Sequence, residues 1–249
     1  MIRLENVHTG FGGKEVLRGL NLHIQRGETY VLLGPSGAGK SVLLKHIVGL
    51  VRPQRGRVTV HERELGEKRG RELREIRRSI GYVFQSGALI NWLTVKENIA
   101  LPLREHTDTP ESEIDKKVKD LLALVHLDEE GDGDKYPDEI SGGMKKRVGI
   151  ARALVLDPPI VLFDEPTAGL DPIRSRAIAS VVERMRASLD VTSLIVTHNL
   201  GIAFQVADRI GFLESGVITE EGTPEEITAS RNPFVQSFIA DRTASGPAT

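Results

Sequence analysis

The chain has 249 residues, of which 39% are hydrophobic and 27% are charged, and it contains no cysteine. This length allows one large domain or two small ones, the composition does not indicate a disordered or membrane-embedded chain, and the lack of cysteine excludes disulfides and thiolate metal sites. The 33 Lys and Arg residues nearly balance the 35 Asp and Glu residues, for a net charge of -2. That balance provides no bulk attraction to nucleic acid or to an anionic membrane.

The N-terminal segment Met1–Asn6 mixes charged with apolar residues and lacks the apolar core of a signal peptide. No later run approaches the roughly 18 apolar residues that a membrane-spanning helix needs. We therefore expect a cytoplasmic protein. If it serves transport, other chains must provide the path through the membrane.

The first part of the chain alternates short apolar runs with turns, which is typical of strands. The expected strands are Ile2–Val7, Val16–Ile24 and Tyr30–Leu33, with Gly12 and Gly13 between the first two. The glycine-rich stretch Gly34–Ser41 follows, and apolar residues then recur at helical spacing across Val42–Leu50. A strand, a glycine loop and a helix thus follow one another.

The later part of the chain predicts a helical insert and two more strand-and-helix units. Glu111, Glu113 and Asp115 open a helical pattern that runs from about Asp108 to Leu127. The further units are Ile160–Phe163 with a helix from about Pro172, and Ser193–Val196 with a helix near Leu200–Val206. Strands that alternate with helices favour parallel pairing. The last residues, 243–249, are small and polar and are expected to form a flexible tail.

The stretch Gly34-x-x-x-x-Gly39-Lys40-Ser41 fits the P-loop pattern in full. Its glycines allow backbone amides to reach phosphate oxygens, Lys40 adds a positive charge for the outer phosphates, and Ser41 adds a hydroxyl for magnesium. The helix that begins here offers unpaired amides to the same anion. The alternative is a chance glycine turn, but the order of strand, loop and helix is the one that phosphate binding requires.

Two carboxylates, Asp164 and Glu165, follow the apolar run Ile160–Phe163. A buried strand would place both at its carboxyl end, where open α/β sheets bind ligands. Asp164 suits a magnesium shell, and Glu165 can orient and deprotonate an attacking water. On its own this segment could equally be a strand that runs into an acidic turn. Beside a P-loop, we favour the functional interpretation.

A third segment, Ile140–Met144, precedes Lys145, Lys146 and Arg147 at the start of a helix whose apolar side includes Val148, Ala151, Leu154 and Val155. Ser141 can cap that helix, and Gly142 and Gly143 let its amides touch an anion. Without the P-loop, an ordinary capped helix would be the better interpretation. With it, this segment is a second candidate for binding phosphate.

From about Met1 to Arg242 the chain resembles the ABC ATPase family, whose elements occur here in the family's order. Asp164 and Glu165 match Walker B, and Ser141–Met144 matches the signature. The resemblance further identifies an aromatic residue stacked on adenine, the Q-loop glutamine, the D-loop aspartate and the switch histidine: Phe11, Gln85, Asp171 and His198. Phe11 or His198 alone would more often be a packed side chain. Their common order makes coincidence untenable.

The resemblance implies an α/β fold, a P-loop NTPase ABC ATPase domain with a RecA-like core, an N-terminal antiparallel β part and an inserted α-helical subdomain. It implies a single domain over residues 1–242, with a nucleotide-binding core at 1–85 and 157–225 and a helical subdomain at about 86–156. The implied cofactors are ATP and Mg²⁺. The implied catalytic residues are Glu165, His198 and Lys40, and the implied metal ligands are Ser41, Gln85 and Asp164. The implied nucleotide-binding residues are Phe11, Gly34, Pro35, Ser36, Gly37, Ala38, Gly39, Lys40, Ser41, Val42, Gln85, Ser141, Gly142, Gly143 and Asp171.

Partners are implied in the same way. Two copies would pack head to tail, with each ATP between one P-loop and the signature of the other copy, and transmembrane permease subunits would dock near Gln85. The chain would then be peripheral, at the cytoplasmic face of the inner membrane, with no nucleic acid partner. The commonest signature begins with Leu and ends with Gln, whereas Ile140 and Met144 stand at those ends here. Ser141, Gly142 and Gly143, which would meet phosphate, are intact.

The segments Phe84–Leu89, Thr94–Ile99 and Leu101–Thr107, together with Met144, look like those of the Mla and Mce lipid transporter ATPases. This resemblance implies phospholipid or related lipid transport between membranes, and a lipid-binding Mce-type partner. Residues 91–93 do not match that pattern, so another transport substrate remains the alternative.

Three rival functions are weighed against this one. A soluble ABC ATPase of DNA repair, chromosome organisation or ribosome work would carry long coiled-coil insertions or two cassettes, and this chain shows neither. A P-loop kinase would need no signature, D-loop or switch histidine. A degenerate regulatory subunit would have lost Lys40, Glu165 or His198, and all three are present.

Overall fold

The computed structural model describes residues 1–66 and 68–244, and side-chain environments as far as residue 240. The chain divides into two compact units. The first combines the residues up to Ile76 with those from Thr192 onward, and the second runs from Arg77 to Val191. The domain limits expected from the sequence remain a prediction. Of the expected tail, residues 243 and 244 belong to the last helix, and residues 245–249 lie outside the described part.

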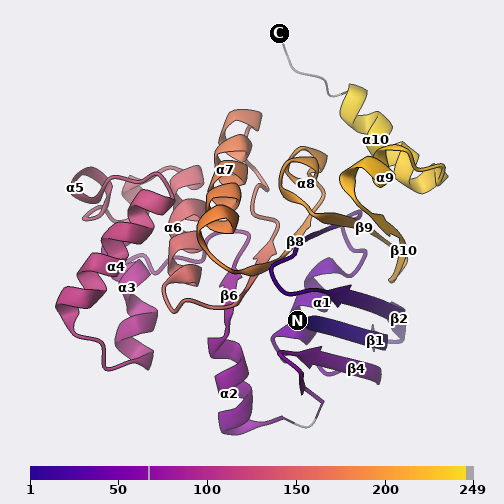
Figure 1. The fold of residues 1–249 in the computed structure, drawn as a ribbon, viewed down its shortest axis with the longest axis horizontal. Helices are drawn as coiled ribbons and strands as arrows, with labels where there is room; N and C mark the ends of the chain where they lie inside the picture. The colour runs from indigo at the N-terminus through magenta and orange to yellow at the C-terminus, as the bar shows by residue number, and fades with distance from the viewer. Residues whose placement is uncertain (67, 245–249) are drawn as a thin grey trace. The chain divides into compact units, whose positions relative to one another are not determined.

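The elements of each unit are labelled in Figure 1. Those of the first unit are β1 Ile2–Phe11, β2 Lys14–Ile24, β3 Thr29–Leu33, α1 Lys40–Ile47, β4 Arg55–Val60, β5 Arg63–Glu64, α2 Gly70–Arg78 (whose last two residues fall in the second unit), β8 Thr192–Thr197, α8 Leu200–Val206, β9 Arg209–Glu214, β10 Val217–Gly222, α9 Pro224–Thr228 and α10 Pro233–Ala244. Those of the second unit are β6 Ile80–Val83, α3 Val95–His106, α4 Glu111–Leu124, α5 Glu129–Asp132, the 3₁₀ turn η1 Pro137–Glu139, α6 Gly142–Leu154, β7 Ile160–Asp164 and α7 Pro172–Ser188.

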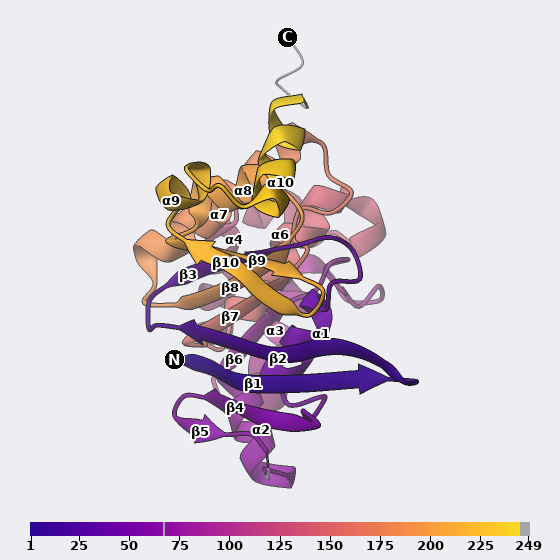
Figure 2. The ribbon, with the colours of Figure 1, turned by 90° about the vertical axis from the view of Figure 1, so that its right-hand side faces the viewer.

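The N-terminal strands form an antiparallel sheet in the order β2-β1-β4-β5, seen at the front of Figure 2. Phe11 pairs with Lys14 across a two-residue turn in which Gly12 and Gly13 have φ values of 57° and 80°. Glycine adopts this left-handed conformation without steric cost, and such turns match the twist of the strands that they join. The expected N-terminal antiparallel β part is confirmed.

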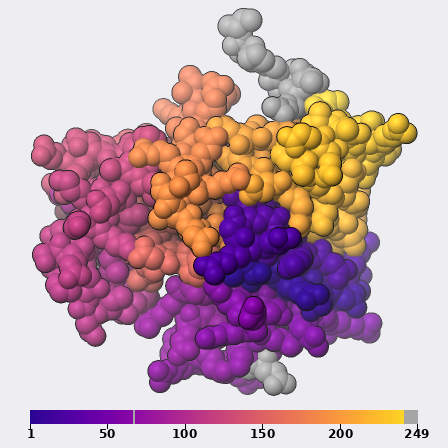
Figure 3. Space-filling model, in the orientation of Figure 1, coloured from indigo at the N-terminus to yellow at the C-terminus, as the bar shows by residue number. Residues whose placement is uncertain are grey.

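A second ladder in the first unit has the strand order β10-β9-β3-β8, with β3 parallel to both β8 and β9. All five residues of β3 are buried, as expected of a continuous apolar run in a parallel sheet. Figure 3 shows the yellow residues of the C-terminal part beside gold-coloured residues of the same unit. There Phe234 and Phe238 of α10 contact the Phe212 ring of β9 edge to face.

The second unit pairs β6 with β7 in parallel and packs helices α3, α4 and α6 side by side (Figure 1). Thr94 caps α3, with the Glu97 side chain bonded back to the Thr94 amide. Buried Asn98 then bonds the backbone of Ile90, Leu93 and Thr94, which ties the preceding loop to this helix. The expected helical part and the mixed α/β class are confirmed.

The first helix after the glycine loop runs from Lys40 to Ile47, whereas the apolar spacing predicted Val42–Leu50. It begins two residues earlier and ends three residues earlier than predicted. It ends early because Gly49 adopts a φ of 66°, a left-handed conformation that cannot continue a helix. In the described part of the chain, no helix combines the length and apolar character needed to cross a membrane.

Candidate functional site

The glycine loop of the first unit joins buried strand β3 to helix α1. Lys40, the first residue of α1, is only 6% exposed, and its Nζ donates to the carbonyl oxygens of Gly34 at 2.7 Å and Pro35 at 3.1 Å. The ammonium is therefore held against the loop. Ser41 and Val42 follow in the first turn of α1, where Ser41 is exposed and Val42 is half-buried. The positive end of the helix dipole favours an anion at this end.

Two glycines of this loop are required by its geometry. A Cβ at Gly34 would collide with the carbonyl oxygen of Leu213 on β9. Gly39 precedes α1 with a φ of 109°, and a Cβ there would lie 2.9 Å from the Leu17 side chain. Both positions exclude larger residues. Gly37, at the exposed tip, has a φ of 81° and open space around it.

His198 leaves strand β8 at the edge where the glycine loop leaves β3. The ladder pairs Leu33 with Thr197, so the next residues, Gly34 and His198, begin side by side. The His198 side chain is exposed, and the following Asn199 caps α8 by accepting from Ile202 N at 3.3 Å. Phe11, the predicted adenine contact, is 52% exposed at the tip of the β1–β2 hairpin in the same unit.

The acidic pair of the second unit lies at the end of buried strand β7. Asp164 accepts a hydrogen bond from the Tyr82 hydroxyl of β6 at 3.1 Å. Burial, and then the neighbouring Asp164 charge, raises the pKa of Tyr82, so its hydroxyl stays protonated and donates. Glu165 has a φ of 49°, an unusual value for a residue other than glycine. Such strain is often concentrated at functional sites.

Gln85 follows β6 at the edge where Asp164 ends β7, because Val83 pairs with Phe163 in the parallel ladder. Its segment is anchored on helix α6. Arg152 donates to the Gly87 carbonyl at 2.8 Å, and a Cβ on Gly149 would lie 3.2 Å from the Gly87 Cα. The Gln85 side chain itself is exposed.

Ser141 caps α6, the helix of the signature segment, by accepting from Met144 N at 3.3 Å. Gly142 is exposed, with no atom within 4 Å of an added Cβ, whereas Gly143 is buried near Arg174. Asp171 caps α7 by accepting from Arg174 N at 2.8 Å, which lowers the pKa of its carboxyl. The signature and the D-loop residue thus begin two helices that pack against each other.

The structure distributes the predicted residues over its two units. The first unit holds Phe11, residues 34–42 and His198, and the second holds Gln85, residues 141–143, Asp164, Glu165 and Asp171. Reasoning from the sequence missed Tyr82 as a partner of Asp164. The signal available was a tyrosine in the short run Ile80–Val83 just before Gln85, and four residues are too few to identify a strand with its partner.

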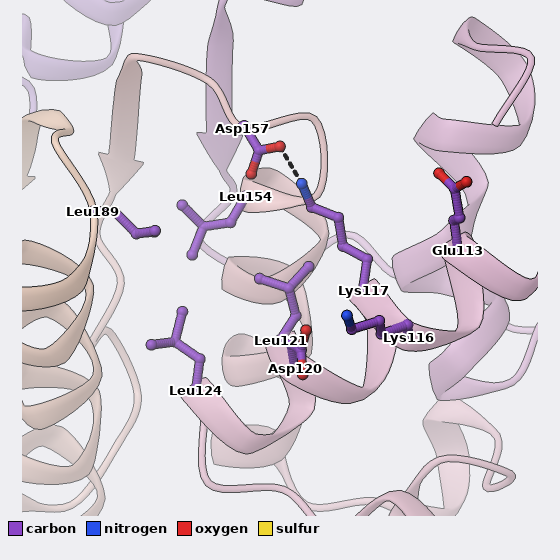
Figure 4. A pocket seen from close by; sticks show the side chains of 9 residues that line it. All are labelled: Glu113, Lys116, Lys117, Asp120, Leu121, Leu124, Leu154, Asp157 and Leu189. Atoms are coloured by element: carbon purple, nitrogen blue, oxygen red, sulfur yellow. Dashed lines mark hydrogen bonds and ion pairs between the residues drawn. The ribbon is translucent and has the colours of Figure 1, made fainter.

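The second unit also has an open hollow of about 550 Å³ between helix α4 and the ends of α6 and α7 (Figure 4). Its floor is formed by Leu121, Leu124, Leu154 and Leu189, and an ion pair joins Lys117 to Asp157 across it. None of the predicted site residues lines this hollow. It is separate from the candidate site.

Comparison with known proteins gives a consistent picture. The family model described as ABC transporter matches residues 17–168. The chain is 45% identical over 241 residues to the probable ribonucleotide transport ATP-binding protein mkl of Mycobacterium tuberculosis. The aligned region covers 97% of this chain and 67% of that protein. The chain is 39% identical over 252 residues to the methionine import ATP-binding protein MetN of Rhodopseudomonas palustris, which covers 98% and 67%. The chain thus spans about two thirds of the length of these relatives.

Among solved structures, the dimeric post-hydrolysis state of the ATP-binding cassette MJ0796 with ADP and Pi matches with a TM-score of 0.81 at 34% identity. That match covers 90% of this chain and 99% of the other. The expected fold class, an ABC ATPase fold of mixed α/β type with an antiparallel β part and a helical part, is confirmed by this likeness.

Proposed function

The chain belongs to the ABC transporter family of ATPases, and on this premise we propose that it is the ATP-hydrolysing subunit of a transporter whose membrane path is formed by separate permease subunits. One observation carries the proposal furthest. The ammonium of Lys40 is held at the start of α1, and His198 leaves the neighbouring parallel strand at the same edge. A positive charge, helix amides and a histidine at one edge suit the phosphates of a nucleotide.

In this proposal the first unit binds the nucleotide. Backbone amides of residues 36–42, which follow Pro35, a residue that itself has no N–H, hold the phosphates together with the Lys40 ammonium. Phe11 stacks on adenine, and His198 contacts the outermost phosphate. The exposure of Phe11 at its hairpin tip supports the stacking role, since an aromatic ring without a protein partner on one face is able to accept a base.

The residues proposed to act in hydrolysis are Ser41 and Lys40 of the first unit and Gln85, Asp164 and Glu165 of the second. The proposed Mg²⁺ ligands are the Ser41 hydroxyl, the Gln85 amide and the Asp164 carboxylate, a set of oxygen donors that suits this hard cation. Mg²⁺ would neutralise charge on the phosphates when bound. Tyr82 orients Asp164 by its hydrogen bond. Glu165 orients a water and takes its proton, and Lys40 stabilises the charge that develops on the phosphate.

We further propose that two copies act head to tail, with Ser141, Gly142 and Gly143 of one copy closing on the nucleotide of the other, and with Asp171 beside them. The open space around Gly142 on a capped helix start supports this role. MJ0796, which this chain resembles, is dimeric in the matched structure. The proposed location is peripheral, on the cytoplasmic face of the cell membrane, with a permease docked near the Gln85 segment.

For the transported substrate we propose phospholipid or a related lipid, with an Mce-type lipid-binding partner. Support comes from the segments Phe84–Leu89 and Leu101–Thr107 and from Met144, which resemble those of lipid transporter ATPases. The relatives named for ribonucleotide and methionine transport point to other cargoes for those proteins.

Two measurements test these proposals. Phosphate release from MgATP by the purified chain tests hydrolysis, and a chain that binds ATP without releasing phosphate would argue against it. Purification from membranes, followed by identification of the attached subunits and lipids, tests the transport role. Recovery of an amino-acid or nucleotide permease would end the lipid proposal and leave the ATPase proposal intact.

A further inference from the structure

A buried lysine of the signature helix reaches the turn that follows the proposed catalytic glutamate. Lys146 is 6% exposed, and its Nζ donates to the carbonyl oxygen of Ala168 at 2.6 Å. Lys146 lies in α6, five residues after the cap Ser141, whereas Ala168 lies three residues after Glu165. This contact joins the helix of the signature to the Walker B turn inside the second unit.

The same turn holds the backbone of Glu165. The Ala168 amide donates to the Glu165 carbonyl at 3.1 Å, which closes a turn in which Glu165 has a φ of 49°. Ala168 therefore makes both bonds: its carbonyl accepts from Lys146, and its amide donates to Glu165. A left-handed φ is strained for a residue with a side chain, so it persists only where the surroundings hold it.

The buried charge of Lys146 supports the same conclusion as its hydrogen bond. Burial lowers the pKa of Lys146, and the negative charge of Glu165 opposes that shift. An ammonium is expensive to bury unless it is bonded, and an apolar side chain of similar length would fill the space without that cost. A purely structural role is therefore a poor explanation for lysine at this position.

The signature helix also lies close to the helix that follows this turn. Gly143 of α6 lies near the Arg174 side chain, with 3.6 Å from an added Cβ to the Arg174 Cδ. Arg174 in turn pairs with Asp171 at 3.4 Å. The signature helix is thus bonded to the Walker B turn at Ala168, and it lies near Arg174, the ion-pair partner of Asp171.

We propose that Lys146 is a positioning residue for hydrolysis, which holds the turn after Glu165 in its active conformation and makes that conformation depend on the signature helix. The inference rests on the proposed function. Because the signature of one copy would close on the partner's nucleotide, a shift of α6 at one site would reach Glu165 at the other through Lys146. Lys146 touches neither the nucleotide nor the attacking water in this role.

The test compares the variants Lys146→Met and Lys146→Arg with the matched control Lys145→Met. Lys145 is a half-exposed lysine on the same helix. Each variant is made in the full chain and purified with any subunits that accompany it. Phosphate release at varied ATP gives kcat and KM, a fluorescent ATP analogue gives affinity, and thermal unfolding gives Tm. For Lys146→Met we expect kcat to fall by roughly 10²-fold, the cost of misplacing a reacting group by about 1 Å. KM and affinity should stay near the wild-type values, because ground-state binding is untouched.

Lys146→Arg should recover most of the lost kcat, since it retains a cationic donor, and Lys145→Met should match the wild type. A kcat for Lys146→Met close to that of the wild type would overturn the proposal. So would equal losses of kcat, affinity and Tm in the Met and Arg variants, which would assign Lys146 to stability alone. A wild-type chain and a Lys145→Met variant that both fail to release phosphate would instead contradict the proposed function, and this inference would fall with it.

Discussion

Leu33 and Thr197 are partners in the parallel ladder of β3 and β8, so the glycine loop and His198 leave these two strands at the same edge of the sheet. The relationship depends on two strands more than 150 residues apart in the chain, and it turns a local phosphate-binding motif into a site with a histidine beside it. The experiments below separate what each residue at this edge, and at the corresponding edge of the second unit, contributes.

Lys40→Ala should weaken ATP binding by roughly 10- to 100-fold, the worth of a hydrogen bond to a charged group. The reason is that the Lys40 ammonium lies against the carbonyls of the loop that is proposed to hold the phosphates. Affinity for a fluorescent ATP analogue measures the effect. Lys45→Ala, an exposed lysine on the same helix, is the control and should bind normally. Unchanged affinity in Lys40→Ala would rule out the assigned role.

Glu165→Gln should retain ATP binding and lose roughly 10²–10⁴-fold in turnover, the usual contribution of a general base. The amide keeps the shape of the side chain but is unable to accept the proton of the attacking water. Phosphate release and ATP affinity, measured on the same preparation, distinguish the two effects. Glu113→Gln, an exposed change on α4, should leave both at wild-type values. Turnover of Glu165→Gln at the wild-type rate would refute the general base.

The sequence predicted those parts of the fold whose signals are local. Strands β3, β7 and β8 each contain a short apolar run, and each is followed by residues of a predicted site. Helix α2 escaped prediction because its sequence is dominated by Arg and Glu and has one buried residue, Ile76. The hairpin of β9 and β10 escaped as well, since β10 alternates weakly and is only partly buried.

The candidate site divides in the same way. Lys40 and Glu165 were predicted from motifs that require little more than neighbours in sequence, and His198 from the resemblance to the ABC ATPase family. The bonds from Tyr82 to Asp164 and from Lys146 to Ala168 join residues 82 and 22 positions apart. Only the pairing of β6 with β7 and the packing of α6 bring these groups together, and neither leaves a pattern in a single sequence.

Tyr82→Phe should raise the Mg²⁺ concentration that gives half-maximal ATPase activity by roughly 10-fold. Loss of a hydrogen bond to a metal ligand usually lowers metal affinity by about that much or more. The variant keeps the ring and removes only the hydroxyl that donates to Asp164. Activity is titrated with Mg²⁺ at saturating ATP. Tyr136→Phe, at an exposed tyrosine, is the control. Identical Mg²⁺ curves for Tyr82→Phe and wild type would show that the bond does not orient Asp164.

Gly142→Ala and Gly34→Ala should have opposite consequences for stability. The Gly142 site is open, and alanine is the better helix former by up to about 1 kcal/mol, so Tm should stay or rise while ATPase activity falls. The added methyl would lie where the partner copy's nucleotide is proposed to approach. At Gly34 the methyl meets the Leu213 carbonyl, and Tm should fall by an amount equivalent to about 1–3 kcal/mol. Full ATPase activity in Gly142→Ala would contradict the head-to-tail arrangement.

His46 on α1 should make the first unit less stable as the solution becomes acidic. Its side chain is buried, and its ring bonds Thr9 Oγ1 through Nε2 at 2.8 Å and the Val51 carbonyl through Nδ1 at 2.9 Å. The Val51 carbonyl accepts from a protonated Nδ1, and in the neutral ring Nε2 accepts from the Thr9 hydroxyl. Burial lowers the pKa of His46 below its ordinary value, whereas the unfolded chain keeps the ordinary value near 6.5.

The sign of the effect follows from proton binding. Above about pH 6.5 neither the folded nor the unfolded state takes up a proton at His46, and the full stability is present. As the pH falls below that value, the unfolded chain binds the proton first. The free energy of unfolding therefore decreases until the pH has passed the pKa of His46 in the folded state. The measurement is Tm against pH for the wild type and for His46→Gln. All other titratable groups are common to the two proteins, so the difference between the curves isolates His46. We expect the difference in Tm between the two proteins to be constant above pH 7 and to narrow below pH 6.5, because only the wild type loses stability through protonation of His46 in its unfolded state. Parallel Tm curves across the whole pH range would mean that His46 is not held neutral.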